Sequence, residues 1–246
     1  MIEINGLTKK YGELIAVNEL NLKISGGKLF GFLGPNGAGK TTTIKIMTGL
    51  IKATGGIVKI AGYDIEKETI KAKASFGYVP DKAFLYDKLT AFEYLQFIVR
   101  VYYKKSNLLE KCNLIYEKLE EFGLLRWKDS LIESFSHGMK QRLLFAAALI
   151  HEPKVLIIDE PLSGLDPMGI KLIREILMDY VNKGNTVFMS THSLGEAEKM
   201  CNLIGIINEG KLISIGDIHG IKQKALLPNS PLEEVFLQLT SGCETE

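Results

Sequence analysis

Residues 34 to 41 read Gly34-Pro35-Asn36-Gly37-Ala38-Gly39-Lys40-Thr41, which is the pattern G-x-x-x-x-G-K-T of the phosphate-binding loop called Walker A. An apolar run at 28–33 precedes the loop, and residues 42–49, beginning with Thr42, follow it with apolar side chains at helical spacing. Strand, glycine loop and helix form the context that the motif requires. Because a chance match arises only about once in a hundred chains of this length, the stretch predicts nucleotide binding.

Each part of the loop has an expected role toward a triphosphate. The backbone N–H groups of the loop and the N-terminus of the following helix favour negative phosphate groups. Lys40 is expected to reach the β- and γ-phosphates, and the Thr41 hydroxyl is expected to ligate Mg²⁺. A nucleoside triphosphate with Mg²⁺ is therefore the expected ligand.

Composition limits the remaining possibilities. The chain has 246 residues, 46% of them hydrophobic, which is enough for a substantial core. A formal net charge of +1 argues against broad nucleic-acid binding, which needs a strong cationic field. The N-terminus has no signal pattern, and the longest apolar run, 143–150, is too short to span a bilayer. Three scattered cysteines without metal-ligand spacing suit a reduced cytosolic protein. We therefore expect a chain that is soluble by itself.

The distribution of patterns along the chain predicts one domain, an α/β core interrupted by helices. Residues of about 1–83 and 151–220 carry the strand signals. Residues 84–150 read as helices, one of them opened by a capping box at Thr90–Glu93, and are expected to form a lobe inserted into the core. Residues 221–246 are expected to form a short helical tail.

Short apolar runs locate the strands of the core. They are expected at 2–4, 15–24, 28–33, 55–63, 75–79, 155–158, 186–190, 203–207 and 211–215. The run at 155–158 is apolar throughout, as expected of a central parallel strand buried on both faces. Helices are expected at about 169–181, from Asn107 to Gly123 in the inserted region, and after Ser230 in the tail.

Two acids follow the buried strand directly. Asp159 is expected to hold Mg²⁺, and Glu160 to orient or deprotonate the attacking water. Acid pairs are common at strand ends, but downstream of a phosphate loop the catalytic interpretation is favoured. His192 ends another strand and is a candidate donor to charge that develops on the γ-phosphate. Tyr11 is either a platform for a base or an ordinary strand-edge tyrosine, and the residues alone leave both open.

Together these motifs resemble the nucleotide-binding subunit of an ABC (ATP-binding cassette) transporter over essentially the whole chain. The distinguishing stretch is 135–142, Phe-Ser-His-Gly-Met-Lys-Gln-Arg, which resembles the family's LSGGQ signature and the basic residues after it. The other matching elements are the Walker A loop at 34–41, the Walker B segment at 155–160, the D-loop at 163–166, the switch histidine His192 and the adenine-stacking aromatic Tyr11.

The resemblance implies a P-loop NTPase (RecA-like) core with an antiparallel β subdomain and an inserted α-helical lobe. It implies ATP and Mg²⁺ as cofactors, with nucleotide contacts from Tyr11 and residues 34–42. Ser136 and Gly138, at the start of the signature helix, would grip the γ-phosphate of ATP bound by the opposite subunit. The implied partners are a second ATP-binding subunit, identical or not, and transmembrane permease subunits. The implied location is cytoplasmic, peripheral on the inner face of the cell membrane.

Two departures from the family pattern concern the site. His137 and Met139 replace Gly and Gln in the signature, while Ser136 and Gly138 are kept, so phosphate gripping is expected to survive with altered strength. Asp81 stands where the family has the Q-loop glutamine. Its carboxylate can meet Mg²⁺ through water, but it also adds like-charge repulsion beside a triphosphate. Asp81 is therefore the third candidate Mg²⁺ ligand, after Thr41 and Asp159.

In similar proteins ATP closes the cassette dimer, hydrolysis reopens it, and a groove between core and lobe passes this motion to membrane subunits. Here the groove is expected along 81–97, and we expect at least half of its aromatic side chains to lie in the core: Phe84, Tyr86, Phe92, Tyr94 and Phe97. The signature variant and the tail 232–237 resemble the export branch, which handles drugs, peptides or polysaccharides.

Two other functions remain open at this point. A soluble ABC-type ATPase acting on ribosomes or DNA usually has two cassettes or long coiled-coil insertions, and this chain has neither pattern. A catalytically weak regulatory cassette is disfavoured by Glu160 and His192 but favoured by Asp81.

Overall fold

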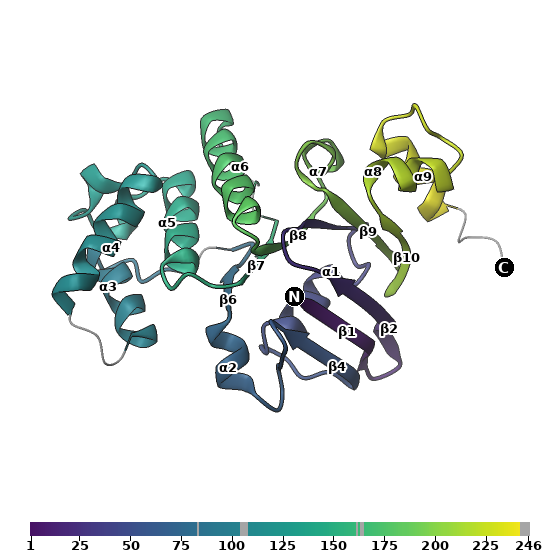
Figure 1. Cartoon of the computed structure of the whole chain (residues 1–246), viewed down its shortest axis with the longest axis horizontal. Helices are drawn as coiled ribbons and strands as arrows, with labels where there is room; N and C mark the ends of the chain where they lie inside the picture. The colour runs from purple at the N-terminus through teal and green to yellow at the C-terminus, as the bar shows by residue number, and fades with distance from the viewer. Residues whose placement is uncertain (83, 104–107, 161, 163–164, 242–246) are drawn as a thin grey trace.

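The computed structural model describes residues 1–82, 84–103, 108–160, 162 and 165–241, which form two β-sheets with helices around them (Figure 1). Within the described residues, the strands of the larger sheet follow one another in space as β10 (Lys211–Gly216), β9 (Leu203–Asn208), β3 (Leu29–Leu33), β8 (Thr186–Thr191), β7 (Val155–Asp159) and β6 (Phe76–Val79). The smaller sheet contains β2 (Leu14–Ile24), β1 (Ile2–Tyr11), β4 (Gly55–Ile60) and β5 (Tyr63–Asp64).

The larger sheet is parallel except at one edge. β3 pairs in parallel with β8 and β9, and β7 with β6 and β8, whereas β10 runs antiparallel to β9. Every residue of β3, β7 and β8 is buried, as expected where both faces of a parallel sheet are covered. The sequence-predicted strands of this sheet are confirmed, including the central strand at 155–158.

The smaller sheet is antiparallel, and the strand predicted at 55–63 is divided into β4 and β5. β1 is longer than the apolar run at 2–4 predicts. β1 pairs with β2 from Ile2–Ile24 to Tyr11–Leu14, although residues 8–10 are polar. Hydrogen bonds to the neighbouring strand supply the pairing there, so no apolar side chains are needed. The end of β1 is thereby fixed at Tyr11.

The helices are α1 (Lys40–Met47), α2 (Thr69–Ala74), α3 (Ala91–Tyr102), α4 (Leu108–Glu121), α5 (His137–Leu149), α6 (Pro167–Asn182), α7 (Leu194–Met200), α8 (Ile218–Lys224) and α9 (Leu232–Ser241). Two 3₁₀ turns, Leu125–Trp127 and Ile132–Ser134, join α4 to α5. The segment between β6 and β7 therefore holds α3, α4 and α5, which lie together at the end of the molecule opposite the C-terminus (Figure 1).

The predicted start of α3 is confirmed in detail. The Thr90 hydroxyl accepts a hydrogen bond from the Glu93 N–H at 3.2 Å, and the Glu93 carboxylate accepts one from the Thr90 N–H at 2.8 Å. This reciprocal capping box satisfies two backbone donors that a helix start leaves free. Asn107, the predicted start of the next helix, lies outside the described residues.

Two hydrophobic clusters lie on opposite faces of the larger sheet. Alternate residues of β7 take part in them: Leu156 and Ile158 pack with α3, α5 and α6, whereas Val155 and Ile157 pack with α1 and the smaller sheet. Phe188 of β8 joins the second cluster, with its ring centroid 5.2 Å from that of Phe32. This double burial fixes the strand ends at which the site residues lie. Within the described residues, no helix is long and apolar enough to cross a membrane.

Candidate nucleotide site

The predicted phosphate loop connects β3 to α1, and its backbone takes a conformation that requires glycine at one position. Gly39, which precedes α1, has φ +105°, and a Cβ atom there would lie 2.5 Å from the carbonyl oxygen of Ala16. The loop thus packs directly against the backbone of β2 with its last residues at the helix N-terminus. The free N–H groups of this terminus can bind phosphate oxygens.

A cavity of about 360 Å³ lies over this loop. Most of the predicted nucleotide-site residues line it together with Ala16: Asn36, Gly37, Gly39, Lys40, Thr41, Thr42, Asp81, Glu160 and His192. Pro35 lines a neighbouring cavity of about 320 Å³ with Gly34, Asn36, His192, Leu194 and Phe236. Ala38, in the middle of the loop, is buried. The structure therefore brings the Walker A loop, Asp81, Glu160 and the switch histidine to one place.

Lys40 is a nearly buried cation, with 7% of its surface exposed. Its Nζ donates hydrogen bonds to the carbonyl oxygens of Gly34 at 2.7 Å and Pro35 at 3.1 Å. Burial lowers the pKa of Lys40, and the negative charges of Glu160 and Asp159 oppose this shift. The ammonium group thus lies within the field of the predicted base, Glu160, and of the predicted Mg²⁺ ligand, Asp159.

Glu160 and His192 form a direct pair at the cavity. Glu160 Oε2 lies 2.7 Å from His192 Nδ1, and it also accepts the backbone N–H of His192 at 3.3 Å. The backbone of Glu160 has φ +50°, a left-handed conformation that residues other than glycine rarely adopt. The pair therefore couples the end of β7 to the end of β8.

Asp159 lies below the cavity and does not line it. Its side chain is 3% exposed, and its Oδ1 accepts a hydrogen bond from the Ser190 hydroxyl. Sequence reasoning missed Ser190, whose only signal was its position two residues before His192. Together with Thr41, Asp159 and Asp81 supply hydroxyl and carboxylate oxygens, the donor type that Mg²⁺ prefers.

Besides Gly34, Pro35, Ala38 and Asp159, three more predicted site residues do not line this cavity: Tyr11, Ser136 and Gly138. Tyr11 has a half-exposed ring, and the Lys9 ammonium lies 4.9 Å from its centroid. Ser136 and Gly138 are at the N-terminus of α5, where the Ser136 hydroxyl accepts the Met139 N–H at 3.3 Å. The predicted capping of this helix by Ser136 is therefore confirmed, while its contact with a nucleotide remains a prediction. Residues 163 and 164 of the predicted D-loop lie outside the described residues.

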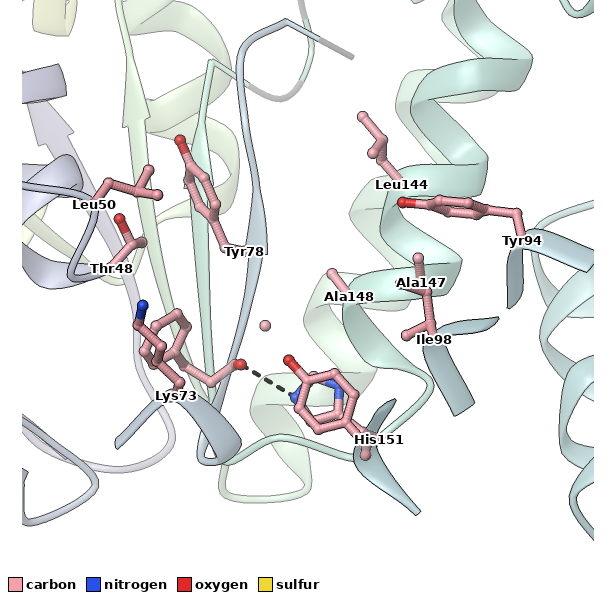
Figure 2. A pocket seen from close by; sticks show the side chains of 13 residues that line it. Thr48, Leu50, Lys73, Tyr78, Tyr94, Ile98, Leu144, Ala147, Ala148 and His151 are labelled. Atoms are coloured by element: carbon pink, nitrogen blue, oxygen red, sulfur yellow. Dashed lines mark hydrogen bonds between the residues drawn. The ribbon is translucent and has the colours of Figure 1, made fainter. Parts of the chain in front are cut away.

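A second cavity, of about 240 Å³, separates the larger sheet from the inserted helices (Figure 2). Lys73 and Tyr78 lie on one side of it, and Tyr94 and Leu144 on the other (Figure 2). His151 lies at one end, where its Nε2 is 3.1 Å from the carbonyl oxygen of Phe76. The groove predicted along 81–97 overlaps this cavity at one residue, because Tyr94 alone among the described residues of that range lines it.

The aromatic residues predicted for the groove are less buried than expected. Tyr94 is 7% exposed and Phe92 packs partly on the core, but Phe84 is 81% exposed. Tyr86 and Phe97 are also exposed, with their ring centroids 5.8 Å apart. The expectation that at least half would be core residues was wrong. Phe84 and Tyr86 lie at the surface before α3, and Phe97 lies on an exposed part of that helix.

Comparison with known proteins identifies the family. A family model described as ABC transporter matches residues 17–163. The chain is 36% identical over its full length to the probable multidrug ABC transporter ATP-binding protein YbhF of Escherichia coli, of which it covers only 43%. It is also 36% identical to the lantibiotic transport ATP-binding protein SrtF of Streptococcus pyogenes, with 96% of each chain covered.

Solved structures agree with this relationship. An ATP-binding subunit of an ABC transporter superposes with a TM-score of 0.90 at 31% identity, covering 97% of this chain and 99% of that one. A dimeric bacterial ABC transporter cassette superposes with a TM-score of 0.82 at 27% identity, covering 89% and 99%. The predicted P-loop NTPase fold, with its antiparallel sheet and helical part, is confirmed. The chain belongs to the ABC transporter family.

Proposed function

We propose that this chain binds ATP with Mg²⁺ over the Walker A loop, hydrolyses it, and uses the cycle to drive export through separate membrane subunits. The observation that carries the proposal is the convergence of Lys40, Glu160 and His192 on one cavity. Hydrolysis of a triphosphate needs a cation at the phosphates, a base beside the attacking water and a donor to developing charge. These three side chains can supply those groups.

Thr41 and Asp159 hold Mg²⁺ in this proposal, with Asp81 as a further oxygen donor. The set fits the ion, because Mg²⁺ is usually bound by one or two carboxylates together with substrate phosphates. When bound, Mg²⁺ would neutralise charge on the β- and γ-phosphates. Tyr11 is proposed to stack on the adenine beside the loop.

The proposal requires a second ATP-binding subunit, because Ser136 and Gly138 do not line the cavity of their own chain. The exposed Ser136 hydroxyl and the backbone N–H groups at the start of α5 form a site for the γ-phosphate of the opposite subunit's ATP. The dimer seen for the solved cassette supports this arrangement. Two subunits, identical or not, would then enclose two nucleotides.

Permease subunits are the proposed membrane partners, with the chain bound at the inner face of the cell membrane. In this proposal the chain consists of a core of residues 1–83 and 151–220, a helical lobe of residues 84–150 and a tail of residues 221–246. The permease subunits would contact the chain along the second cavity, between core and lobe. The exposed aromatic rings of Phe84 and Tyr86 support this placement, since such side chains are enriched at protein interfaces. The names of the two relatives favour a drug or a lantibiotic as cargo.

A catalytically weak regulatory cassette is the second candidate, and one observation favours it. Asp81 lines the nucleotide cavity, where its carboxylate adds repulsion toward a triphosphate. Turnover by the wild-type chain with its partners distinguishes the two candidates. Co-purification with ribosomes or DNA instead of a membrane protein would favour a soluble ATPase.

Glu160→Gln tests the catalytic part of the proposal. The amide keeps the shape of the side chain but cannot act as the base, so turnover is expected to fall about 10²–10⁴-fold while ATP still binds and drives dimerisation. Phosphate release and light scattering measure the two effects. Glu152→Gln is the matched control, because Glu152 also has a left-handed backbone, with φ +52°, and lies outside the cavity. Unchanged turnover in Glu160→Gln would remove Glu160 from the mechanism.

A further inference from the structure

Ser190 lies at the carboxyl end of β8, beside the end of β7, and its side chain is fully buried. Its hydroxyl donates a hydrogen bond to Asp159 Oδ1 at 2.5 Å. The hydroxyl oxygen of Ser190 itself accepts a hydrogen bond from the backbone N–H of Glu160 at 3.2 Å. A single hydroxyl thus joins the carboxylate that would hold Mg²⁺ to the residue that would act as the base.

The strand register makes this contact possible. Asp159 and Ser190 are paired across the parallel strands β7 and β8. Because paired residues of neighbouring strands present their side chains to the same face, the carboxylate and the hydroxyl lie next to each other. Both are buried, so their hydrogen bond does not compete with bulk water.

The contact restricts the rotation of Asp159. With Oδ1 accepting the Ser190 hydroxyl, the carboxylate cannot turn about its Cβ–Cγ bond without breaking a charge-assisted hydrogen bond. Such bonds are stronger than those between neutral groups, and no water replaces them at a buried position. Its second oxygen therefore keeps a constant direction.

Ser190 also supports the unusual backbone of Glu160. The Glu160 N–H is shared between the carbonyl oxygen and the hydroxyl of Ser190, each at 3.2 Å. This attachment fixes a left-handed residue, with φ +50°, whose side chain reaches His192 Nδ1 at 2.7 Å. A strained backbone persists only where its surroundings hold it.

We propose that Ser190 is a positioning residue of the ATPase site, which orients Asp159 for Mg²⁺ and holds the backbone that directs Glu160. The inference rests on the proposed roles of these two acids. Ser190 is buried and does not line the nucleotide cavity, so its proposed role is to act through its neighbours. A purely structural serine would contribute to the stability of the sheet without affecting metal affinity.

The test measures Mn²⁺ binding to the full chain with ATPγS by electron paramagnetic resonance, together with kcat and KM for Mg·ATP. Ser190→Ala is expected to weaken Mn²⁺ binding and to lower kcat, each by about 10- to 100-fold, as is typical when a hydrogen-bond partner of a metal ligand is removed. ATPγS binding in EDTA is expected to stay unchanged, because no metal is then oriented. Ser190→Thr keeps the hydroxyl and is expected to restore both quantities.

Thr186→Val is the matched control. Thr186 is also fully buried on β8, and its hydroxyl bonds to the carbonyl oxygen of Ser25, away from the cavity. If Ser190→Ala folds poorly, Ser190→Cys replaces it, because the thiol occupies the position of the hydroxyl group and is a weaker hydrogen-bond donor. The same measurements apply.

Wild-type Mn²⁺ affinity and kcat in the folded Ala or Cys variant would overturn the inference. An equal loss in Thr186→Val would overturn it too, because the effect would then be general destabilisation. Glu160→Gln measured in parallel separates the two proposals. Normal turnover there would overturn the assignment of the base, whereas loss there with a normal Ser190→Ala would overturn the positioning role alone.

Discussion

Lys40 is a cation held beside the proposed phosphate site by neutral partners. Its Nζ bonds to two backbone carbonyls, and its pKa is lowered by burial. Carbonyl oxygens are weaker partners for an ammonium group than charged phosphate oxygens. Bound phosphate can therefore take over these hydrogen bonds without a large movement of the side chain.

Lys40→Ala is expected to weaken ATP binding about 10- to 100-fold, since hydrogen bonds to charged groups contribute about 1.5–3 kcal/mol. Titration calorimetry with ATP measures the affinity. Lys45→Ala is the control, because Lys45 lies on the same helix but is exposed and outside the cavity. Normal ATP affinity of Lys40→Ala would contradict the role assigned to this lysine.

Site residues that belong to a local sequence motif could be predicted, whereas residues whose role depends on contacts made in the folded chain could not. Lys40, Glu160 and His192 lie in or after recognisable patterns, and the structure brings them together. Ser190 depends on strand register, which links residues 31 positions apart and leaves no local trace. Tyr11 lies at the end of β1, a position that fits both a platform for a base and an ordinary strand-edge tyrosine.

His151 is such an unpredicted residue, and it connects the sheet to the inserted helices. Its ring stacks on Tyr102 of α3, with centroids 3.8 Å apart, and bonds to the Phe76 carbonyl of β6 (Figure 2). Lys73 and Tyr78 line the same cavity, and Glu152 follows in the chain. The Nδ1 atom of His151 is buried without a hydrogen-bond partner among the described residues. Burial lowers the pKa of His151, and the bond to Phe76 only partly opposes this shift.

Stability is therefore expected to depend on pH through His151. Because its pKa is lower in the folded state, its stabilising contribution is complete above the ordinary histidine pKa of about 6.5 and is lost as the pH falls through the lowered value. Urea unfolding at a series of pH values on both sides of about 6.5 measures how steeply the free energy of unfolding depends on pH. His151→Phe keeps an aromatic stack without titration and is expected to flatten the slope, whereas exposed His219→Gln should leave it unchanged. An unaltered slope in His151→Phe would assign the dependence to other groups.

Among the elements, α5 combines a structural role with a proposed functional one at its N-terminus. Ser136 caps the helix through the Met139 N–H, and the next residues carry the signature. Loss of the cap alone would affect folding, while loss of phosphate binding would affect dimerisation. The two roles can be separated by side chains that differ in charge.

Ser136→Ala is expected to lower the free energy of unfolding by about 1 kcal/mol and also to weaken ATP-induced dimerisation. Ser136→Asp keeps a good cap, so its stability should match the wild type, but its charge repels the partner's γ-phosphate and dimerisation should fail. Urea unfolding and light scattering of the Glu160→Gln background measure both effects. Dimerisation of the Asp variant at wild-type ATP concentrations would exclude a phosphate contact at Ser136.

The elements that could be predicted are those with strong local signals. The apolar strands and the capping box of α3 were found, whereas α2, α7 and α8 were not. These three helices have six or seven residues, too few for a clear helical period. They are stabilised by packing on neighbouring elements, as Ala72 of α2 and Ile221 of α8 show by their complete burial.

At the scale of the whole molecule, the end of β6 lies between the two cavities. Tyr78 lines the cavity beside the inserted helices, and Asp81, three residues later, lines the nucleotide cavity. Burial raises the pKa of Tyr78 to about 12, and the charges of Asp159 and Asp81 add to the shift. The phenol therefore stays neutral and within the field of both acids. A change at the nucleotide can reach the groove through this short segment.

Asp81→Ala is accordingly expected to disturb the coupling of ATP hydrolysis to transport more than hydrolysis itself. Transport per ATP should fall about 5-fold or more, at the lower end of typical coupling between sites, while hydrolysis without cargo changes less. Both rates are measured in proteoliposomes that contain this chain together with the proposed membrane subunits. Asp81→Gln restores the residue usual in the family and should stay coupled, because an amide can still meet the metal through water and carries no repulsive charge. Lys82→Ala controls for an exposed change next to it. Fully coupled transport after Asp81→Ala would show that the signal reaches the membrane subunits by another route.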